Sequence, residues 1–421
     1  MLDIVRGNDP DYSSLQHVYG AIGAPEAILR PRTAHDVSDA LAFAREASGE
    51  LSIRSGGHGI SSTSTNFGGT VIDLGRLNTI EHIGGNSVRL GPGARWGHVA
   101  RELYPWGLAI SSGDSGDVGV GGLATAGGIG LMGRAHGLTI DRLRSVEIVT
   151  GDGLIHRASA HENSDLFWGV RGAGANLGIV TSFEFEASET PIVAHATLAY
   201  RPGHTADFLE AWGETLESAR REISAFLYLF GGANPFTQAT VVFAGDDREA
   251  ASAAITPFAA LPGFAGQRAQ LAPYATVPIT TDAPHAGQQS AFTHAGLADH
   301  LSRELSRRLD ELLAEGSTQM IQIRSAGGAI NDVPQDATAY AHRHQNFSVT
   351  AIAPEESLRF DAAWEPVHQL MSGMYLSFES GHDASRILEA FPHTTLERLR
   401  SLKRTWDPDW LFTQNFDVTP G

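Results

Sequence analysis

Along residues 1–190, helical spacing of apolar residues alternates with short extended runs. Between Val37 and Ala44 the apolar positions recur at three- and four-residue intervals, which places them on one face of a helix. Thr33 precedes this run and Asp36 follows three residues later, a pattern that predicts an N-cap. The segment RWGHVARELYPWG predicts a second, short helix that ends at a glycine. Strands are predicted at Leu51–Ile53, Thr70–Leu74 and Ser87–Leu90.

A different pattern of polar and apolar residues predicts a second domain over residues 191–375. Long helical patterns such as LADHLSRELSRRLDELLAEG are mixed with extended segments such as TQMIQIRSAGG and NFSVTAIA, in which polar and apolar residues alternate. This alternation is typical of a half-exposed antiparallel sheet, so the helices are expected to cover one face only. Residues 376–421 return to a helical signature followed by a loop, and we expect them to rejoin the domain of residues 1–190.

Composition is consistent with a globular protein of two domains. The chain has 421 residues, of which 42% are hydrophobic and 19% charged. Its formal net charge of −18 argues against a nucleic-acid partner, because binding to a phosphate backbone depends on clustered Lys and Arg. No stretch reaches membrane-spanning length and the N-terminus lacks a signal-peptide core, so we expect a cytoplasmic protein with no membrane partner.

Missing residue types exclude several chemistries. The chain has no cysteine, which excludes a thiolate nucleophile, an iron–sulfur cluster and a disulfide. Its one lysine, Lys403, lies in the charged run RLRSLKRTWDPD and is expected to be exposed, which disfavours Schiff-base chemistry. No P-loop motif is present. His342 and His344 alternate at a predicted strand end without an HExxH motif, so no metal site is expected.

The segment SGDSGD, from Ser112 to Asp117, matches the nucleophile segment of trypsin-like proteases. Such a site also needs His and Asp on a two-barrel scaffold, which this glycine-rich pattern does not predict. The GxSxG elbow is absent because position 117 is Asp. A hydrolase is therefore a minor alternative.

Three glycine clusters fall within the first domain: RSGGHG (54–59), GDVGVGGLATAGGIG (116–130) and RGAGANLGIVT (171–181). Successive glycines let backbone N–H groups surround an anionic or planar ligand. A dinucleotide spread over several loops would explain three clusters in one domain. Any single cluster is also explained by the glycines of an ordinary turn. The spacing of GAGANLG does not fit GxGxxG and no long buried strand precedes it, so a Rossmann site is disfavoured.

These motifs together resemble the berberine bridge enzyme-like branch of the FAD-linked oxidases, whose fold is shared with vanillyl-alcohol oxidase and p-cresol methylhydroxylase. The similarity runs almost from end to end through IRSGGHG, VGVGGLATAGGIGLMGRAHGLTIDRL, DLFWGVRGAGANLGIVTSFEF, GGAINDVPQDATAYAHR and LRSLKRTWDPDWLF. The resemblance implies an α+β fold with an FAD-binding domain and a substrate domain whose antiparallel sheet is backed by helices.

The resemblance also implies the cofactor and its attachment. In the family the His of RSGGH is bonded to the flavin 8α carbon, which makes His58 the expected tether of FAD. Many relatives add a second bond through a Cys, but that position is Ser115 here, so a single link is expected, as in the hydroxynicotine oxidases. Val118 occupies the family position that controls oxygen access, which favours an oxidase. The other expected FAD-binding residues are Arg54, Ser55, Gly56, Gly57, Gly59, Ile60, Gly121, Gly122, Gly127, Gly128, Gly178, Ile179, Val180 and Asn415.

For catalysis, the resemblance points to residues on three strands. Tyr375 in MYLSFES matches the Tyr of a Tyr-x-Asn-aromatic pattern that acts as or orients a base, with Ser377 in place of Asn; a strand here would put both on one face. In MIQIRSAGG, the alternation of a strand puts Gln322 and Arg324 on one face and Ile321 and Ile323 on the other. The resemblance implies that Gln322 would orient the substrate, that Arg324 would bind a carboxylate or anionic reduced flavin, and that Tyr228 would line the pocket.

The function implied is oxidation of a small-molecule alcohol or amine, alkaloid-like or another natural product, with hydride transfer to FAD and reoxidation by molecular oxygen to hydrogen peroxide. Two alternatives remain: a flavin dehydrogenase with another acceptor, and a flavin-binding cyclase or isomerase without net redox chemistry.

Overall fold

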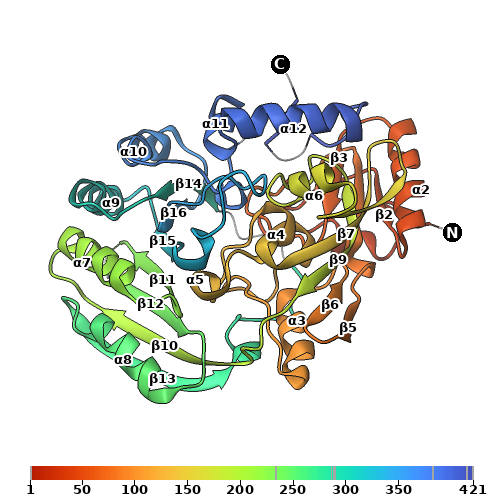
Figure 1. Cartoon of the computed structure of the whole chain (residues 1–421). Coiled ribbons are helices and arrows are strands. Elements are labelled where there is room, and N and C mark those ends of the chain that lie inside the picture. Colours follow the sequence, from red (N-terminus) through yellow and green to blue (C-terminus); the bar gives the residue numbers. More distant parts are fainter. Residues whose placement is uncertain are drawn as a thin grey trace.

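A computed structural model describes residues 2–232, 235–285, 287, 291–381, 384–413 and 416–419. In Figure 1 the red-to-yellow N-terminal part carries two small sheets, and the green-to-teal part carries one large sheet covered by helices. The blue helix α12 (His393–Trp406) crosses back over the N-terminal part, where it contacts α6 (Ser164–Val170) (Figure 1). No helix in these described ranges is long and apolar enough to cross a membrane.

The N-terminal part contains a four-stranded and a five-stranded sheet. The first has the order β1 (Asp3–Val5), β2 (Ala27–Arg30), β4 (Thr70–Asp73) and β3 (Leu51–Arg54), with β2, β4 and β3 parallel. The second is antiparallel in the order β5 (Ile80–Gly84), β6 (Ser87–Leu90), β9 (Ile179–Glu186), β7 (Leu143–Val149) and β8 (Ile155–Ser159). The three strands predicted in this part correspond to β3, β4 and β6.

The large sheet has seven antiparallel strands. Their order is β13 (Phe264–Pro273), β10 (Ile192–Tyr200), β12 (Phe236–Phe243), β11 (Ile223–Phe230), β15 (Met320–Ser325), β16 (Phe347–Ala353) and β14 (Phe292–Ala298). One face packs against α7 (Thr205–Ser218), α8 (Arg248–Ala259), α9 (Arg303–Glu315) and α10 (Leu358–His368) in a continuous apolar core.

The remaining helices are short, except for α2 (Ala34–Glu46). Its start is set as the sequence predicts, because the Thr33 side chain accepts a hydrogen bond of 3.1 Å from the Asp36 amide. The predicted second helix is α3 (Trp96–Leu103), and the chain turns at Gly107 with φ 71°. The others are α1 (Tyr12–Leu15), α4 (Val120–Ala126), α5 (Gly133–His136) and α11 (Ile387–Ala390).

The second face of the large sheet packs against the N-terminal part, so the prediction of a half-exposed sheet is wrong. Phe226 of β11 and Val242 of β12 are fully buried in a cluster that includes Ile129 and Met132 from the glycine-rich segment. On β15, the polar residues Gln322 and Arg324 are buried and face an internal site instead of solvent. The alternating polar residues therefore marked a face that lines an internal site. In the sequence, such a face has the same pattern as a face exposed to solvent.

Two buried arginines join the two parts. Arg134 on α5 donates to the carbonyls of Ile223, Ala326 and Ala219, at 2.8, 3.2 and 3.1 Å. Arg343 makes two hydrogen bonds of 2.8 Å to the carboxylate of Asp141. Because these partners come from both sides of the interface, they fix how the large sheet faces the glycine-rich segment.

Three local predictions are wrong. Segment MYLSFES is not a strand: Tyr375 precedes a short 3₁₀ helix, Leu376–Phe378, so the proposed shared face with Ser377 does not exist. Lys403 is completely buried on α12, because an ion pair to Asp407 compensates its charge. His342 and His344 lie outside any strand, and His342 is buried against the carbonyl of Ala390.

Candidate functional site

The loop that follows β3 lies directly against the segment that leads into α4. A Cβ added to Gly56 would lie 2.4 Å from the amide N of Gly119, and a Cβ added to Gly119 would lie 2.2 Å from the amide N of Gly56. The Ser55 hydroxyl donates to the carbonyl of Pro92 at 2.5 Å and accepts from the amide of Gly121 at 3.1 Å. Only glycine permits backbones this close, so the first two glycine clusters of the sequence form one cradle.

His58 stands on this loop with an unused ring nitrogen. Its Nδ1 is buried and has no hydrogen-bond partner among the described residues. The ring lies 4.3 Å from that of Tyr19 and 5.3 Å from that of His285, measured between centroids. Burial, followed by the proximity of His285, lowers the pKa of His58 to about 4. The imidazole is therefore neutral near pH 7 and has a nitrogen available for a ligand.

Arg54, which the resemblance places among the FAD-binding residues, contacts neighbouring segments of the protein. Its guanidinium makes an ion pair of 2.7 Å with Asp73 and donates to the carbonyl of Leu15 at 2.6 Å. Both contacts tie the end of β3 to neighbouring segments. Arg54 therefore holds the loop that carries His58.

The structure spreads the other predicted cofactor residues over the cradle and its surroundings. Gly57 has φ 66°, and Gly59 and Ile60 continue the loop toward solvent. The backbone of Ser115 forms a β-bridge with that of Ile279, and Val118 packs against the buried apolar cluster of the N-terminal part. Gly121 and Gly122 lie in the first turn of α4, whereas Gly127 and Gly128 follow its end. Gly178 approaches the carbonyl of Val149, Ile179 and Val180 are buried in β9, and Asn415 lies outside the described residues.

A polar cluster lies on the inner face of the large sheet. Tyr228 of β11 and Gln322 of β15 both donate to Oδ2 of Asp114, at 2.6 and 2.9 Å. Arg324, two residues along β15, donates to the side-chain amide oxygen Oε1 of Gln322. The predicted shared face of Gln322 and Arg324 is confirmed, since Ile321 and Ile323 point into the opposite core.

Aromatic rings form one wall of this cluster. The Phe378 ring centroid lies 3.6 Å from the guanidinium carbon of Arg324, close enough for a cation–π contact. The Tyr375 hydroxyl accepts a hydrogen bond of 3.0 Å from the amide of Gly128, and a Cβ on Gly127 would lie 3.2 Å from the Tyr375 ring. Tyr375 therefore connects the second glycine cluster to the polar cluster, although its segment is not a strand.

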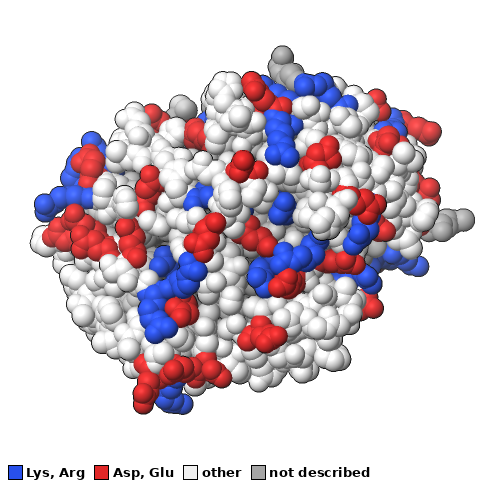
Figure 2. Space-filling model, in the orientation of Figure 1, with Lys and Arg blue, Asp and Glu red and all other residues white. Residues whose placement is uncertain are grey.

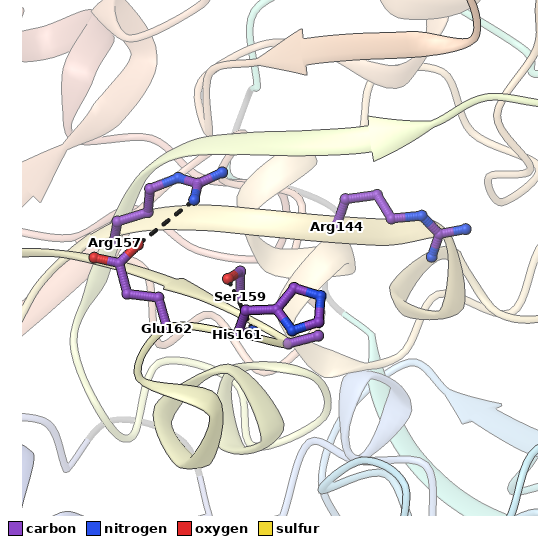
Figure 3. A pocket seen from close by; sticks show the side chains of 6 residues that line it. Arg144, Arg157, Ser159, His161 and Glu162 are labelled. Carbon is purple, nitrogen blue, oxygen red and sulfur yellow. Dashed lines mark hydrogen bonds and ion pairs between the residues drawn. The ribbon is translucent and has the colours of Figure 1, made fainter.

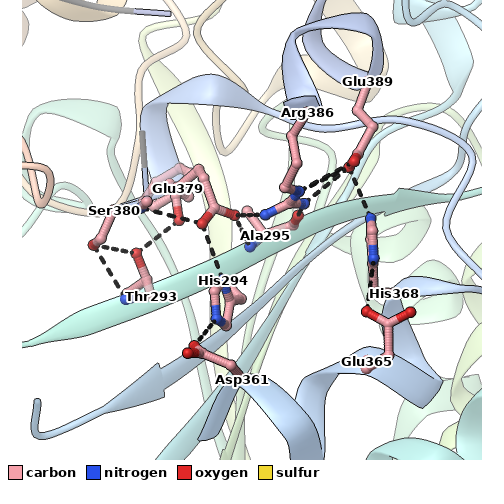
Figure 4. Close-up of polar contacts among 12 residues, drawn as sticks. Thr293, His294, Ala295, Asp361, Glu365, His368, Glu379, Ser380, Arg386 and Glu389 are labelled. Atoms are coloured by element: carbon pink, nitrogen blue, oxygen red, sulfur yellow. Dashed lines mark hydrogen bonds and ion pairs between the residues drawn. The ribbon is translucent and has the colours of Figure 1, made fainter. Parts of the chain in front are cut away.

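A buried charge network holds this wall from behind (Figure 4). Glu379, which is 1% exposed, lies 3.0 Å from Nδ1 of His294 and 2.9 Å from Arg386. The other ring nitrogen of His294 lies 2.9 Å from Asp361. Because Glu379 directly follows Phe378, the network fixes the wall against β14.

A hollow of about 620 Å³ outside this site is lined by Arg144, Arg157, Ser159, Ala160, His161 and Glu162 (Figure 3). Its arginines are already paired with acidic residues: Arg144 with Glu186 and Arg157 with Glu162 and Glu184. Figure 2 shows the same mixture of signs across the visible face. We therefore do not assign the functional site to this hollow.

Sequence reasoning missed four members of the site: Asp114, Tyr19, His285 and Phe378. Asp114 was visible in SGDSGD, but its strand partners lie more than a hundred residues away. The others have no motif of their own, because they belong to the site only through packing.

The residues present suit a planar, anionic dinucleotide. The cradle leaves no room for side chains, His58 offers an unpartnered ring nitrogen, and Arg324 supplies a buried positive charge beside the polar cluster. These features fit FAD, the cofactor that the resemblance implies.

Comparison with known proteins supports this assignment. Residues 25–159 match a family model described as an FAD binding domain. The FAD-linked oxidoreductase tazG of Aspergillus terreus is 29% identical, over 99% of this chain and 92% of the relative. The (R)-6-hydroxynicotine oxidase of Paenarthrobacter nicotinovorans is 35% identical, over 45% of this chain and 42% of the relative.

Solved structures show the same two-domain fold. The xylooligosaccharide oxidase of Myceliophthora thermophila, in complex with xylobiose, aligns with a TM-score of 0.88 and 26% identity, over 100% of this chain and 97% of its own. The glucooligosaccharide oxidase of Acremonium strictum, described as carrying 6-S-cysteinyl, 8α-N1-histidyl FAD, aligns with a TM-score of 0.87 and 23% identity over the same shares.

Proposed function

We propose that this chain, an FAD-linked oxidoreductase, oxidises a small-molecule alcohol or amine that is alkaloid-like or another natural product. In this proposal, FAD is attached covalently to His58 and molecular oxygen is the final acceptor. The observation that carries this proposal is the neutral, unpartnered Nδ1 of His58 in a glycine cradle beside the polar cluster.

A single link follows from the residue types present. A second link of the cysteinyl kind needs a thiol, and the chain has none. Ser115 occupies the position that the resemblance assigns to that cysteine, where its backbone pairs with Ile279. The similarity to a hydroxynicotine oxidase is in keeping with an amine or alcohol substrate, but its aligned part covers less than half of this chain.

The chemistry supplied by bound FAD is two-electron oxidation of a C–H bond, with the electrons passed on to oxygen as hydrogen peroxide. Around it, Gln322 and Tyr228 both donate to the carboxylate of Asp114 and would orient polar groups of a substrate beside it, and Tyr375 fixes the second glycine cluster through the amide of Gly128. Arg324 provides a positive charge that favours an anionic partner in a site closed to water on the sheet side.

The tether is tested by acid precipitation of the yellow protein followed by intact-mass measurement. The wild-type polypeptide should retain one FAD in the pellet, and His58→Ala should release its FAD into the supernatant. His161→Ala, an exposed histidine on the five-stranded-sheet side, is the matched control and should retain the flavin. Flavin retained by His58→Ala after precipitation would contradict the proposed tether.

The reaction class is tested by anaerobic mixing with a panel of small alcohols and amines. A substrate should bleach the flavin absorbance in stoichiometric amounts, and admission of oxygen should restore the colour with formation of hydrogen peroxide. Bleaching that air does not reverse, but an artificial acceptor does, would indicate a dehydrogenase.

A further inference from the structure

Asp114 is placed in the polar cluster by its backbone as well as by its side chain. The amide of Ile279 donates to the carbonyl of Asp114 at 2.8 Å, and the amide of Gly116 returns a bond of 2.7 Å to Ile279. These bonds hold the SGDSGD segment between the glycine cradle and the large sheet. The two sheet donors, Tyr228 and Gln322, both reach Oδ2 of the same carboxylate.

The second oxygen of this carboxylate is left for a ligand. No described residue donates a hydrogen bond to Oδ1 of Asp114, and the side chain is partly exposed. A carboxylate oxygen only accepts hydrogen bonds, so the complementary group on a ligand is an O–H or N–H. Those are the groups that an alcohol or an amine carries on the carbon to be oxidised.

The neighbouring groups cannot accept that proton as readily. Gln322 has no titratable proton, and Tyr375 is a phenol that must lose its own proton before acting as a base. Burial, together with the charge of Asp114, raises the pKa of Tyr228, which keeps its hydroxyl a donor. The buried guanidinium of Arg324 donates to the side-chain amide of Gln322, which itself contacts Asp114. Its positive charge therefore balances the negative charge of the Asp114 carboxylate.

We propose, on the premise of the oxidase function above, that Asp114 is the catalytic base. The substrate O–H or N–H bond breaks and its proton passes to Oδ1 of Asp114. The adjacent carbon would lose its hydrogen as a hydride, with both electrons of the C–H bond, to oxidised FAD, and the electron pair freed on oxygen or nitrogen would form the C=O or C=N bond. The substrate is oxidised, the flavin is reduced, and Asp114 returns the proton to solvent once the product has left.

The first test uses sulfite, an anion that adds to flavins and bleaches them, and it needs no substrate. Holoprotein variants Asp114→Asn and Asp114→Glu are compared with Asp332→Asn, an exposed carboxylate that pairs with Arg221. Asp114→Asn should tighten sulfite binding about tenfold, because it removes a negative charge near the reacting centre. Asp114→Glu and Asp332→Asn should leave it within about twofold. Equal affinity in Asp114→Asn and wild type, or no detectable binding in either, would overturn the proposal.

The second test uses whichever alcohol or amine bleaches the wild-type flavin. Asp114→Asn should lower kcat by about 10² to 10⁴ and lose the acid limb of the kcat/KM profile, and Asp114→Glu should restore that limb. An acid limb that persists in Asp114→Asn would overturn the proposal. A yellow protein that no compound bleaches would instead contradict the oxidase function, while the sulfite result still decides whether Asp114 faces the flavin.

Discussion

Nζ of Lys403 lies 2.9 Å from Oδ2 of Asp407, and neither side chain is exposed to solvent. The ammonium also donates to the carbonyls of Asn176 and Phe412, at 3.0 and 2.6 Å. Asp407 in turn accepts from the amides of Leu411 and Phe412. This buried pair anchors the end of the chain to the third glycine cluster, which contains Asn176.

Removal of the Lys403 ammonium should destabilise the folded protein. We expect Lys403→Met to lower the free energy of unfolding by about 3–5 kcal/mol, because it leaves the Asp407 carboxylate buried without its counter-charge. Arg404→Met, on the exposed side of the same helix, should change it by less than about 0.5 kcal/mol. Urea denaturation followed by circular dichroism measures both. Equal midpoints for the two variants would contradict the stabilising role of the pair.

Flavin attachment should tolerate mild acid. The pKa of His58 is lowered to about 4, so the nucleophilic neutral imidazole predominates at every pH well above 4. We expect the rate of FAD incorporation into flavin-free protein to stay constant from pH 8 to about 5.5 and to halve near pH 4. Intact mass at timed intervals gives this rate. Half-maximal incorporation near pH 6.5, the ordinary value for histidine, would show that burial does not control the tether.

Two glycines near the start of α4 should respond differently to one added methyl group. Gly119→Ala would place its Cβ 2.2 Å from the amide of Gly56, so the cradle must open, and we expect loss of flavin and a fall in Tm. Gly122→Ala meets nothing within 4 Å and lies in a helix, so stability should be unchanged or rise by about 0.5–1 kcal/mol. Thermal denaturation and flavin content test the pair; equal Tm values would argue against the close approach.

The charge network behind Phe378 should make stability depend on pH. Both ring nitrogens of His294 face carboxylates, which only an imidazolium satisfies. Burial lowers the pKa of His294, but Glu379 and Asp361 outweigh it, against opposition from Arg386, so the net shift is upward. The contribution is therefore fully present below pH 6.5 and is lost as pH rises through the higher folded-state pKa.

His294→Gln should accordingly lower the free energy of unfolding by about 1–3 kcal/mol at pH 6 and by less at pH 9. His300→Gln, whose exposed imidazole pairs with Glu217, is the matched control and should show little effect at either pH. Denaturant titrations at both pH values measure the difference. A loss that is the same at pH 6 and pH 9 would mean that His294 is neutral in the folded protein.

The sequence by itself determined what depends on neighbours along the chain. The Thr33 cap, strands β3, β4 and β6, and the shared face of Gln322 and Arg324 follow from spacing within a few residues, because backbone geometry repeats every 3.6 or 2 residues. The glycine clusters likewise marked where backbones come together.

Only the tertiary structure decided which of these residues meet. Asp114 joins Tyr228 and Gln322 across the domain interface, Lys403 is buried because Asp407 and two carbonyls receive its charge, and Tyr375 reaches Gly128 from a 3₁₀ turn. Such contacts depend on how separate sheets pack against each other. Local hydrophobic periodicity carries no information about that packing, since a polar residue facing an internal site and one facing water give the same pattern.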